Sequence, residues 1–362
     1  MSIGEASLTP FSQLDSLIAF ASTRQPAHRI SGKVARISST YIVVSGLSKF
    51  VSIGDVVSIA GIGGPVLAEV ASIEANTINV TPFIADHRIE LAARVTAMSG
   101  QLMLSPDDSW LGRTLNALGH PIDDAGPLQP GGRAVPIQGS PPAALRRSRL
   151  GDALTTGVKA IDLFTPICAG QRIGIFAGSG VGKSTLLAML SRAPSSDVTV
   201  LALVGERSRE VRDFLDDTLS ASRSRVVSVV ATSDESPMMR RLAPSTAMCI
   251  AEYYRDQGKN VLLIIDSLTR YAHAMRELAL AADEPPVARG YPPSVFSALP
   301  RLLERAGTGV EGSGTITAIL SVLIDGDDHN DPIADTARGI LDGHIVLDRG
   351  IASQGRLPAV TL

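Results

Sequence analysis

The hydrophobic pattern divides the chain into segments of different periodicity. Residues 7–22 place apolar side chains at helical spacing, and Pro10 and Ser12 can begin the helix. This short amphipathic helix either packs on its own body or docks on a partner protein. Residues 28–98 instead contain six short runs in which apolar and polar positions alternate, separated by Gly and Asn. Such runs predict a small closed or nearly closed β-barrel.

The chain after the predicted barrel has a different pattern. A Pro- and Gly-rich stretch at residues 119–145 indicates a loop-rich linker. From residue 154 onward, apolar runs alternate with segments of helical periodicity, which predicts an α/β fold with helices on both faces of a mostly parallel sheet. Ligands of such sheets bind at the carboxyl ends of the strands. The runs expected to form strands are residues 172–177, 198–204, 225–231, 261–266 and 315–324.

The composition narrows the class of protein. Of 362 residues, 44% are apolar and 19% are charged, which suits a globular protein with a real core. The net charge of −3 gives no attraction to nucleic acid or to an anionic membrane. No apolar run reaches the ~18 residues of a membrane span, and residues 1–10 lack the features of a secretion signal. Cys168 and Cys249 have apolar or small neighbours, so we expect buried free thiols in a reducing cytoplasm.

The predicted barrel raises the question of nucleic-acid binding. Some barrels of this kind stack the bases of single strands on aromatic side chains. This segment offers Tyr41, Phe50 and Phe83 and has no basic stripe. We therefore interpret the barrel as structural.

One motif carries specific chemistry. Residues 172–177 lead into a phosphate-binding loop, followed by Thr185 and a helical pattern, and Ala177 stands at the first glycine position. Backbone N–H groups of the loop and of the helix N-terminus can bind phosphate oxygens. Lys183 can neutralise the β- and γ-phosphates, and the Ser184 hydroxyl can bind Mg²⁺. The loop comprises Ala177, Gly178, Ser179, Gly180, Val181, Gly182, Lys183 and Ser184.

Two acidic residues follow predicted strands at the edge where the phosphates would lie. Asp266 ends an apolar run and can hold the Mg²⁺ shell; the alternative is a helix cap at Asp266-Ser267. Glu206 follows the run 198–204 and can polarise the attacking water. The alternative for Glu206 is a charged residue at the start of a solvated helix.

Long blocks of the chain resemble the ring ATPases related to the catalytic subunit of the rotary ATP synthase. Within that group the likeness is strongest to the flagellar export ATPase and its virulence type III secretion relatives. The resemblance implies an α/β fold: a RecA-like P-loop core with a mostly parallel sheet, preceded by a small N-terminal β-barrel. We divide the chain into a tail (1–25), a barrel (26–97) and a nucleotide-binding domain (98–362). The matching blocks are residues 106–123, 155–187, 204–211, 264–280, 284–307 and 331–349.

The resemblance also implies roles for single residues. Glu206 matches the catalytic carboxylate, which non-catalytic paralogues lack, and Arg207 matches a phosphate-sensing arginine. Asp266 matches the acid of the Mg²⁺ shell, and Thr185 joins the nucleotide-binding loop. Leu357 stands where the family usually has an aromatic ring on adenine, so it offers apolar contact without stacking.

A second departure concerns the end of the chain. After the position of Leu362 the family continues with a Ser-x-Ser-Arg stretch, whose arginine reaches the neighbouring subunit's site, and with a helical domain. We expect the 362-residue chain to bind Mg-ATP, to hydrolyse it slowly and to be mainly monomeric.

The resemblance implies that ATP and Mg²⁺ are the cofactors of a hexameric ATPase that energises flagellar or type III protein export. It would be cytoplasmic and peripheral at the inner-membrane export apparatus. Implied partners are an export regulator bound through the N-terminal tail, the export gate, and cargo with its chaperones, without nucleic acid. The alternatives are a virulence secretion ATPase, a proton-translocating ATP synthase catalytic subunit, a hexameric nucleic-acid translocase, and an assembly-only or inactive product. Residues 284–307 favour the export branch over the synthase branch.

Overall fold

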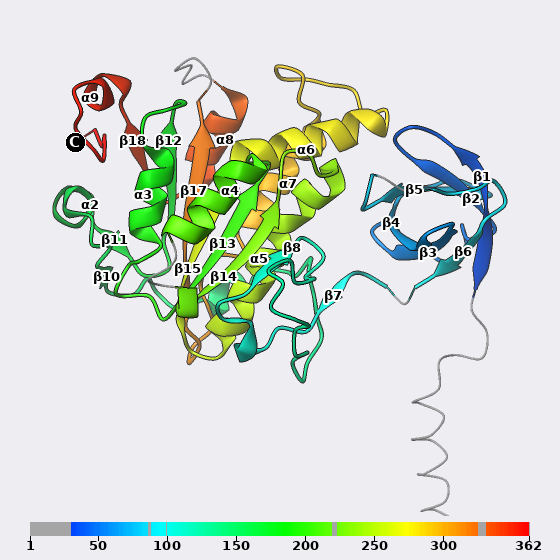
Figure 1. Cartoon of the computed structure of the whole chain (residues 1–362), viewed down its shortest axis with the longest axis horizontal. Helices are drawn as coiled ribbons and strands as arrows, with labels where there is room; N and C mark the ends of the chain where they lie inside the picture. Colours follow the sequence, from blue (N-terminus) through cyan, green and yellow to red (C-terminus); the bar gives the residue numbers. More distant parts are fainter. Residues whose placement is uncertain (1–29, 86–87, 99, 219–222, 325–330, 362) are drawn as a thin grey trace, which may run out of the picture.

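The computed structural model describes residues 30–85, 88–98, 100–218, 223–324 and 331–361. The helix expected at residues 7–22 lies outside these ranges. Two bodies lie next to each other along the longest axis, and the smaller one is built from the N-terminal strands (Figure 1).

The smaller body is the closed barrel that the alternating pattern predicts. Its strands close in the order β1-β2-β5-β4-β3-β6, and every neighbouring pair is antiparallel. Alternate valines and isoleucines fill the interior, and Val44, Val57 and Val80 are fully buried. The strands are β1 (Ser31–Ile37), β2 (Ile42–Ser45), β3 (Val56–Gly61), β4 (Gly64–Ile73), β5 (Thr77–Pro82) and β6 (Arg94–Ala97).

The larger body is built on a sheet whose main path is parallel, in the order β18-β12-β17-β15-β13-β14-β8. The five predicted strands form its centre. Both edge strands were missed, because β8 has three residues and β18 is only partly buried. A short β16 (Gly307–Thr308) pairs antiparallel with β17. The main strands are β8 (Thr114–Asn116), β12 (Arg172–Ala177), β13 (Val198–Val204), β14 (Val226–Ala231), β15 (Asn260–Asp266), β17 (Thr315–Leu323) and β18 (Gly343–Leu347).

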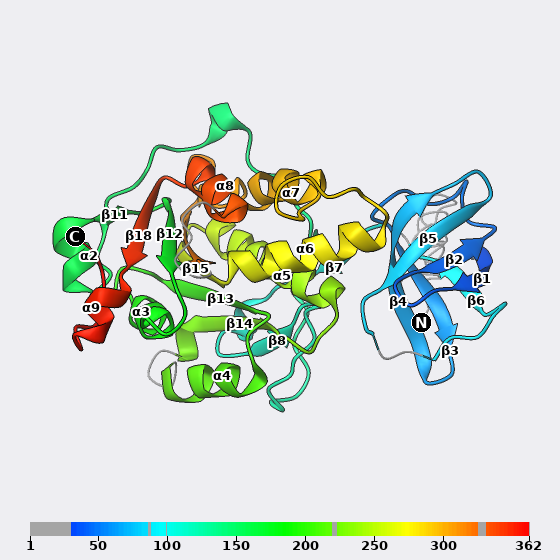
Figure 2. The same cartoon turned by 90° about the horizontal axis from the view of Figure 1, so that it is seen from above.

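Helices cover both faces of this sheet. The group α5 to α8 lies on one face, and α3 and α4 lie on the other (Figure 2). Helix α5 begins where a serine caps its first turn and a proline occupies the first helical position. The helices are α2 (Lys159–Phe164), α3 (Lys183–Leu190), α4 (Ser208–Asp213), α5 (Pro237–Asp256), α6 (Leu268–Ala281), α7 (Pro293–Leu303), α8 (Pro332–Ile340) and α9 (Arg349–Ser353).

Shorter elements complete the connections. A π-helical turn, η3 (Phe214–Thr218), follows α4. Two small antiparallel ladders pair β7 with β9 and β10 with β11. The remaining elements are β7 (Met103–Leu104), η1 (Asp108–Trp110), β9 (Val135–Pro136), η2 (Ala144–Arg146), β10 (Ala153–Leu154), β11 (Ile167–Cys168) and η4 (Arg223–Arg225).

Two hydrophobic cores lie on opposite faces of the sheet. Adjacent residues of one strand enter different cores: Phe176 of β12 packs with the α5–α8 side, and Ile175 packs with the α3 side. Every residue of β13 is buried, as expected for a strand covered on both faces. Cys249 is buried in α5 as expected. The same expectation is wrong for Cys168, which is half-buried because the β10–β11 ladder lies at the surface.

Polar contacts join the barrel to the start of α5. The Ser236 hydroxyl, which accepts the α5 capping bond from the Met239 N–H, donates to the Phe83 carbonyl. The Arg241 guanidinium bonds to the Glu69 carboxylate of β4 at 2.6 Å. Phe83 itself packs in the core of the larger body. The barrel is therefore attached to the helix that follows β14.

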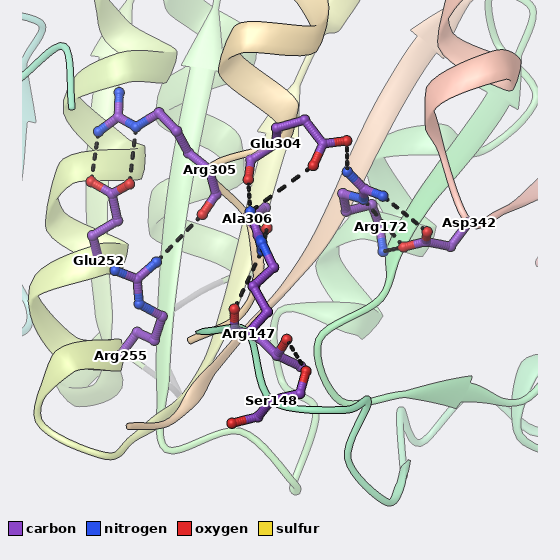
Figure 3. A network of polar contacts seen from close by, with 10 residues as sticks. Arg147, Ser148, Arg172, Glu252, Arg255, Glu304, Arg305, Ala306 and Asp342 are labelled. Atoms are coloured by element: carbon purple, nitrogen blue, oxygen red, sulfur yellow. Dashed lines mark hydrogen bonds and ion pairs between the residues drawn. The ribbon is translucent and has the colours of Figure 1, made fainter. Parts of the chain in front are cut away.

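A network of arginines anchors the linker at the end of the sheet opposite the phosphate-binding loop (Figure 3). Arg147 donates to the carbonyls of Glu304, Ala306 and Thr308. The buried Arg305 binds both Glu252 oxygens at 2.7 and 2.9 Å and also donates to the Ile137 carbonyl. These bonds join the end of the linker to the segment after α7, and they satisfy backbone carbonyls of that segment and of Ile137.

Within the described part of the chain, no helix combines the length and the apolar character needed to cross a membrane.

Candidate active site

The phosphate-binding loop connects β12 to α3. Ala177 and Val181 are buried and fix its base, whereas Ser179 and Gly180 are exposed. Gly182 precedes the helix with φ +90°, a conformation that L side chains rarely adopt. A Cβ atom on Gly182 would also lie 3.0 Å from Leu357 Cδ2. The glycine therefore allows the turn and leaves the first N–H groups of α3 without a side-chain cap.

Three charged side chains meet at the end of the loop. The Lys183 ammonium contacts Asp266 Oδ1 and lies 3.7 Å from Glu206 Oε1. The parallel register pairs Leu203 of β13 with Asp266 of β15, so both carboxylates reach the same edge of the sheet. All three side chains are almost fully buried. One cation therefore lies between two anions that would otherwise repel each other.

Glu206 turns inward immediately after β13 ends. Besides Lys183, the Arg270 guanidinium faces it, with Nε 3.2 Å from Oε1 and Nη2 3.4 Å from Oε2. Burial raises the pKa of the Glu206 carboxyl above its ordinary value. Lys183 and Arg270 oppose that rise in pKa, and the Asp266 carboxylate adds to it. A carboxylate with a raised pKa is better able to accept a proton near neutral pH.

The helix-cap alternative applies to Ser267 and not to Asp266. The Ser267 hydroxyl accepts the Arg270 N–H and caps α6. The Asp266 carboxylate instead contacts Lys183 and accepts a hydrogen bond from Ser321. Likewise, helix α4 begins only at Ser208, so Glu206 is not a solvated residue of its first turn.

Of the remaining residues predicted from the sequence, Ser184, Thr185 and Leu357 lie at the site, and Arg207 does not. Ser184 and Thr185 line a cavity of about 420 Å³, together with Glu206 and Asp266. Leu357 lies against Gly182 and is 59% exposed. Arg207 lies outside this group, because its side chain is 79% exposed and pairs with Glu210 of α4.

Sequence reasoning missed Arg270 and Ser321. Arg270 occupies the first turn of α6, where a cation opposes the helix dipole. That unfavourable placement is a signal that could have drawn attention to it. Ser321 gives no such signal, because a small polar residue in a buried strand is compatible with many structural roles.

The oxygen ligands at the site fit Mg²⁺. Among the described residues, no group of three His, Cys, Asp or Glu side chains could hold a metal ion by itself. The Ser184 hydroxyl and the Asp266 carboxylate line the same cavity. Mg²⁺ in nucleotide sites is typically bound by one or two protein oxygens and takes its other ligands from phosphates and water. The residues present therefore suit a metal that arrives with a nucleotide.

Comparison with known proteins agrees with this geometry. The family model described as "ATP synthase alpha/beta family, nucleotide-binding domain" matches residues 157–362. The "Flagellum-specific ATP synthase" of Rhizobium meliloti (strain 1021) is 57% identical, over 91% of this chain and 70% of that protein. The "SPI-2 type 3 secretion system ATPase" of Salmonella typhimurium is 47% identical, over 82% of this chain and 68% of that protein.

Solved structures give the same result for the fold. The assembled ATPase EscN from the type III secretion system of enteropathogenic E. coli superposes with a TM-score of 0.84 and 42% sequence identity. The match covers 91% of this chain and 79% of that one. EscN in complex with its central stalk EscO gives a TM-score of 0.82.

Proposed function

Because the chain belongs to the ATP synthase alpha/beta family, we propose that it is an ATPase whose turnover energises flagellar protein export. The observation that carries the chemistry is the Lys183 ammonium between the carboxylates of Glu206 and Asp266 beside the glycine loop. The identity of 57% with a flagellum-specific ATP synthase supports the flagellar branch.

We assign the site residues as follows. The N–H groups of Gly178, Gly180 and Gly182 and of the start of α3 bind phosphate oxygens. The Lys183 ammonium leaves the two carboxylates to meet the β- and γ-phosphates. Glu206 orients the attacking water and accepts its proton. Residues 177–185 form the nucleotide loop, and Leu357 contacts the base.

Mg²⁺ supplies charge neutralisation at the phosphates when it is bound. Ser184 and Asp266 are the residues that would hold it. The exposed Arg207 can serve as a phosphate-sensing residue only if its side chain turns away from Glu210, because it now points to solvent.

Assembly and partners follow from the named relatives. EscN is described as assembled and as bound to a central stalk, and we propose that this protein works in a ring, the homo-hexamer expected for full-length members of its family. We propose a cytoplasmic protein that works peripherally at the inner-membrane export apparatus. Its tail (1–25) would bind an export regulator, and the ring would meet the export gate and cargo with chaperones. The domain division at residues 25 and 97 remains part of this proposal.

Virulence type III secretion is the second candidate, favoured by the EscN match. A virulence secretion ATPase would catalyse the same ATP hydrolysis as a flagellar one, and only the exported cargo would differ. Nucleic-acid translocation is less well supported, because the barrel has no basic stripe and Phe83 is buried and cannot stack on a base, although Phe50 is 58% exposed.

The proposed activity can be tested directly by measuring phosphate release from ATP with Mg²⁺, with EDTA and with added RNA. We expect Mg²⁺-dependent turnover that RNA does not stimulate. No turnover, or turnover that requires RNA, would contradict the proposal. For the partner, removal of residues 1–25 should weaken pull-down of flagellar export components in comparison with the whole chain.

A further inference from the structure

The hydrogen-bond ladder between β15 and β17 ends before β17 does. Its last pair is Ile265 with Leu320, because the chain leaves the sheet after Asp266 to form α6. Side chains continue the connection. The Ser321 hydroxyl donates to Asp266 Oδ1 at 2.6 Å, and the Leu323 N–H donates to Thr269 Oγ1 at 2.9 Å. Strand β17 is therefore bonded to both sides of the corner at which β15 becomes α6.

Ser321 is held rigidly in this position. It is fully buried, and on its other side β17 pairs with β12, where Ser321 lies opposite Ile175. Ile319, two residues earlier on the same strand, packs in the core on the α3 side. Because side chains alternate along a strand, Ser321 also points to the face that carries the phosphate-binding loop.

Asp266 Oδ1 receives two donors, the Ser321 hydroxyl and the Lys183 ammonium. Both donors lie on Oδ1, and none of the residues that the structure describes donates a hydrogen bond to Asp266 Oδ2. In the proposed function the Lys183 ammonium turns to the phosphates, and Ser321 is then the donor that remains on Asp266 Oδ1.

We propose that Ser321 is a positioning residue for the metal acid. Its buried hydroxyl keeps the Asp266 carboxylate in one orientation, with Oδ1 bound to β17 and Oδ2 available for Mg²⁺ and its water. The proposal rests on the proposed function, in which Asp266 holds Mg²⁺ beside the nucleotide. Hydrogen-bond partners of metal-binding carboxylates typically contribute a factor of ~10–100 to metal affinity.

The test measures binding and not only turnover. The affinity for a fluorescent ADP analogue, mant-ADP, is determined with excess Mg²⁺ and with EDTA, and the ratio of the two dissociation constants gives the tightening due to Mg²⁺. We expect Ser321→Ala to reduce this ratio about tenfold or more, with affinity in EDTA near the wild-type value. Ser321→Cys keeps a side chain of similar size but has only a weak donor, so it should reduce the ratio as well. It serves as the test if the alanine variant does not fold.

Two controls distinguish a positioning role from loss of buried polarity. Thr317→Val removes another buried hydroxyl of β17, which accepts the Gly170 N–H at 2.9 Å at the opposite end of the strand. It should leave the Mg²⁺ ratio unchanged. Ser321→Thr keeps the hydroxyl and should retain the wild-type ratio.

The outcomes separate this inference from the proposed function. A wild-type ratio in folded Ser321→Ala, or an equal loss in Thr317→Val, overturns the role of Ser321 and leaves the ATPase proposal intact. A wild-type chain that binds mant-ADP no better with Mg²⁺ than with EDTA overturns the proposed metal site itself.

Discussion

Arg270→Ala should slow ATP turnover and leave nucleotide affinity close to the wild-type value. The guanidinium faces Glu206 with two nitrogens, at 3.2 and 3.4 Å. It belongs to α6 and not to the phosphate-binding loop. Removing it takes away one of the two cations that orient the carboxylate and keep it ionised.

The size of the effect follows from the geometry. A hydrogen bond to a charged group contributes ~1.5–3 kcal/mol, and each ~1.4 kcal/mol corresponds to a factor of ten in rate. The Arg270 side chain is 33% exposed, so solvent screening favours the lower end of this range. We therefore expect kcat to fall about tenfold. Arg270→Lys keeps the positive charge but cannot place two nitrogens against the two Glu206 oxygens, so kcat should decrease less than in the alanine variant.

The pH profile provides a second readout. Arg270 opposes the rise in the pKa of Glu206, so its removal raises that pKa further. Glu206 must be deprotonated to accept a proton, and the acid limb of the kcat profile should therefore move to higher pH. Arg276→Ala is the matched control, because Arg276 lies on the same helix but over the Tyr291 ring, and it should leave kcat and the profile unchanged. A wild-type kcat and acid limb in Arg270→Ala would refute the reasoning.

Further predictions concern three variants in the loop and its neighbours. Lys183→Ala should abolish phosphate release at saturating Mg-ATP, because its ammonium is the side-chain cation of the loop; near-normal turnover in a folded variant would remove the central assignment. Glu206→Gln should reduce hydrolysis ~10²–10⁴-fold while nucleotide binding persists. The same variant should raise Tm at pH 7. The pKa of Glu206 is raised in the folded chain, so the carboxyl destabilises the native state once the pH exceeds its ordinary pKa, and glutamine removes this cost; a lower Tm would instead indicate a structural role. Leu357→Tyr should tighten ATP binding by up to ~10-fold, because an aromatic stack contributes up to ~1.5 kcal/mol. Titration with ATP measures the affinity, and the control variant Leu357→Ile should bind like wild type.

The chain's sequence predicts the centre of the sheet well, because β12 to β17 are apolar runs bounded by polar residues. Residues 172–177 and 198–204 coincide with β12 and β13. The edge strands escape this pattern, because β18 has an exposed face and β8 sits among glycines and polar residues. An edge strand is defined by its pairing with a neighbouring strand that is distant in the sequence, so a short stretch of sequence does not reveal it.

The same distinction holds for the candidate site. Lys183 is fixed by a local motif, and Glu206 and Asp266 by their places after apolar strands. The contacts of Arg270 with Glu206 and of Ser321 with Asp266 span 64 and 55 positions. Local sequence therefore does not predict them, and only the folded structure shows them. Arg207 shows the converse: it is adjacent to Glu206 in sequence, yet the turn after β13 points one side chain inward and the other to solvent.

The arginine network around the linker has a consequence for hydrogen exchange. The guanidinium of Arg147 binds three carbonyls between Glu304 and Thr308, and the adjacent Ser148 N–H donates to the Gly309 carbonyl. We therefore expect the Ser148 amide to exchange with deuterium more slowly than an unbonded loop amide, because the bond to the Gly309 carbonyl must open first. Composition predicts a loop here, but hydrogen bonds join it to the segment after α7.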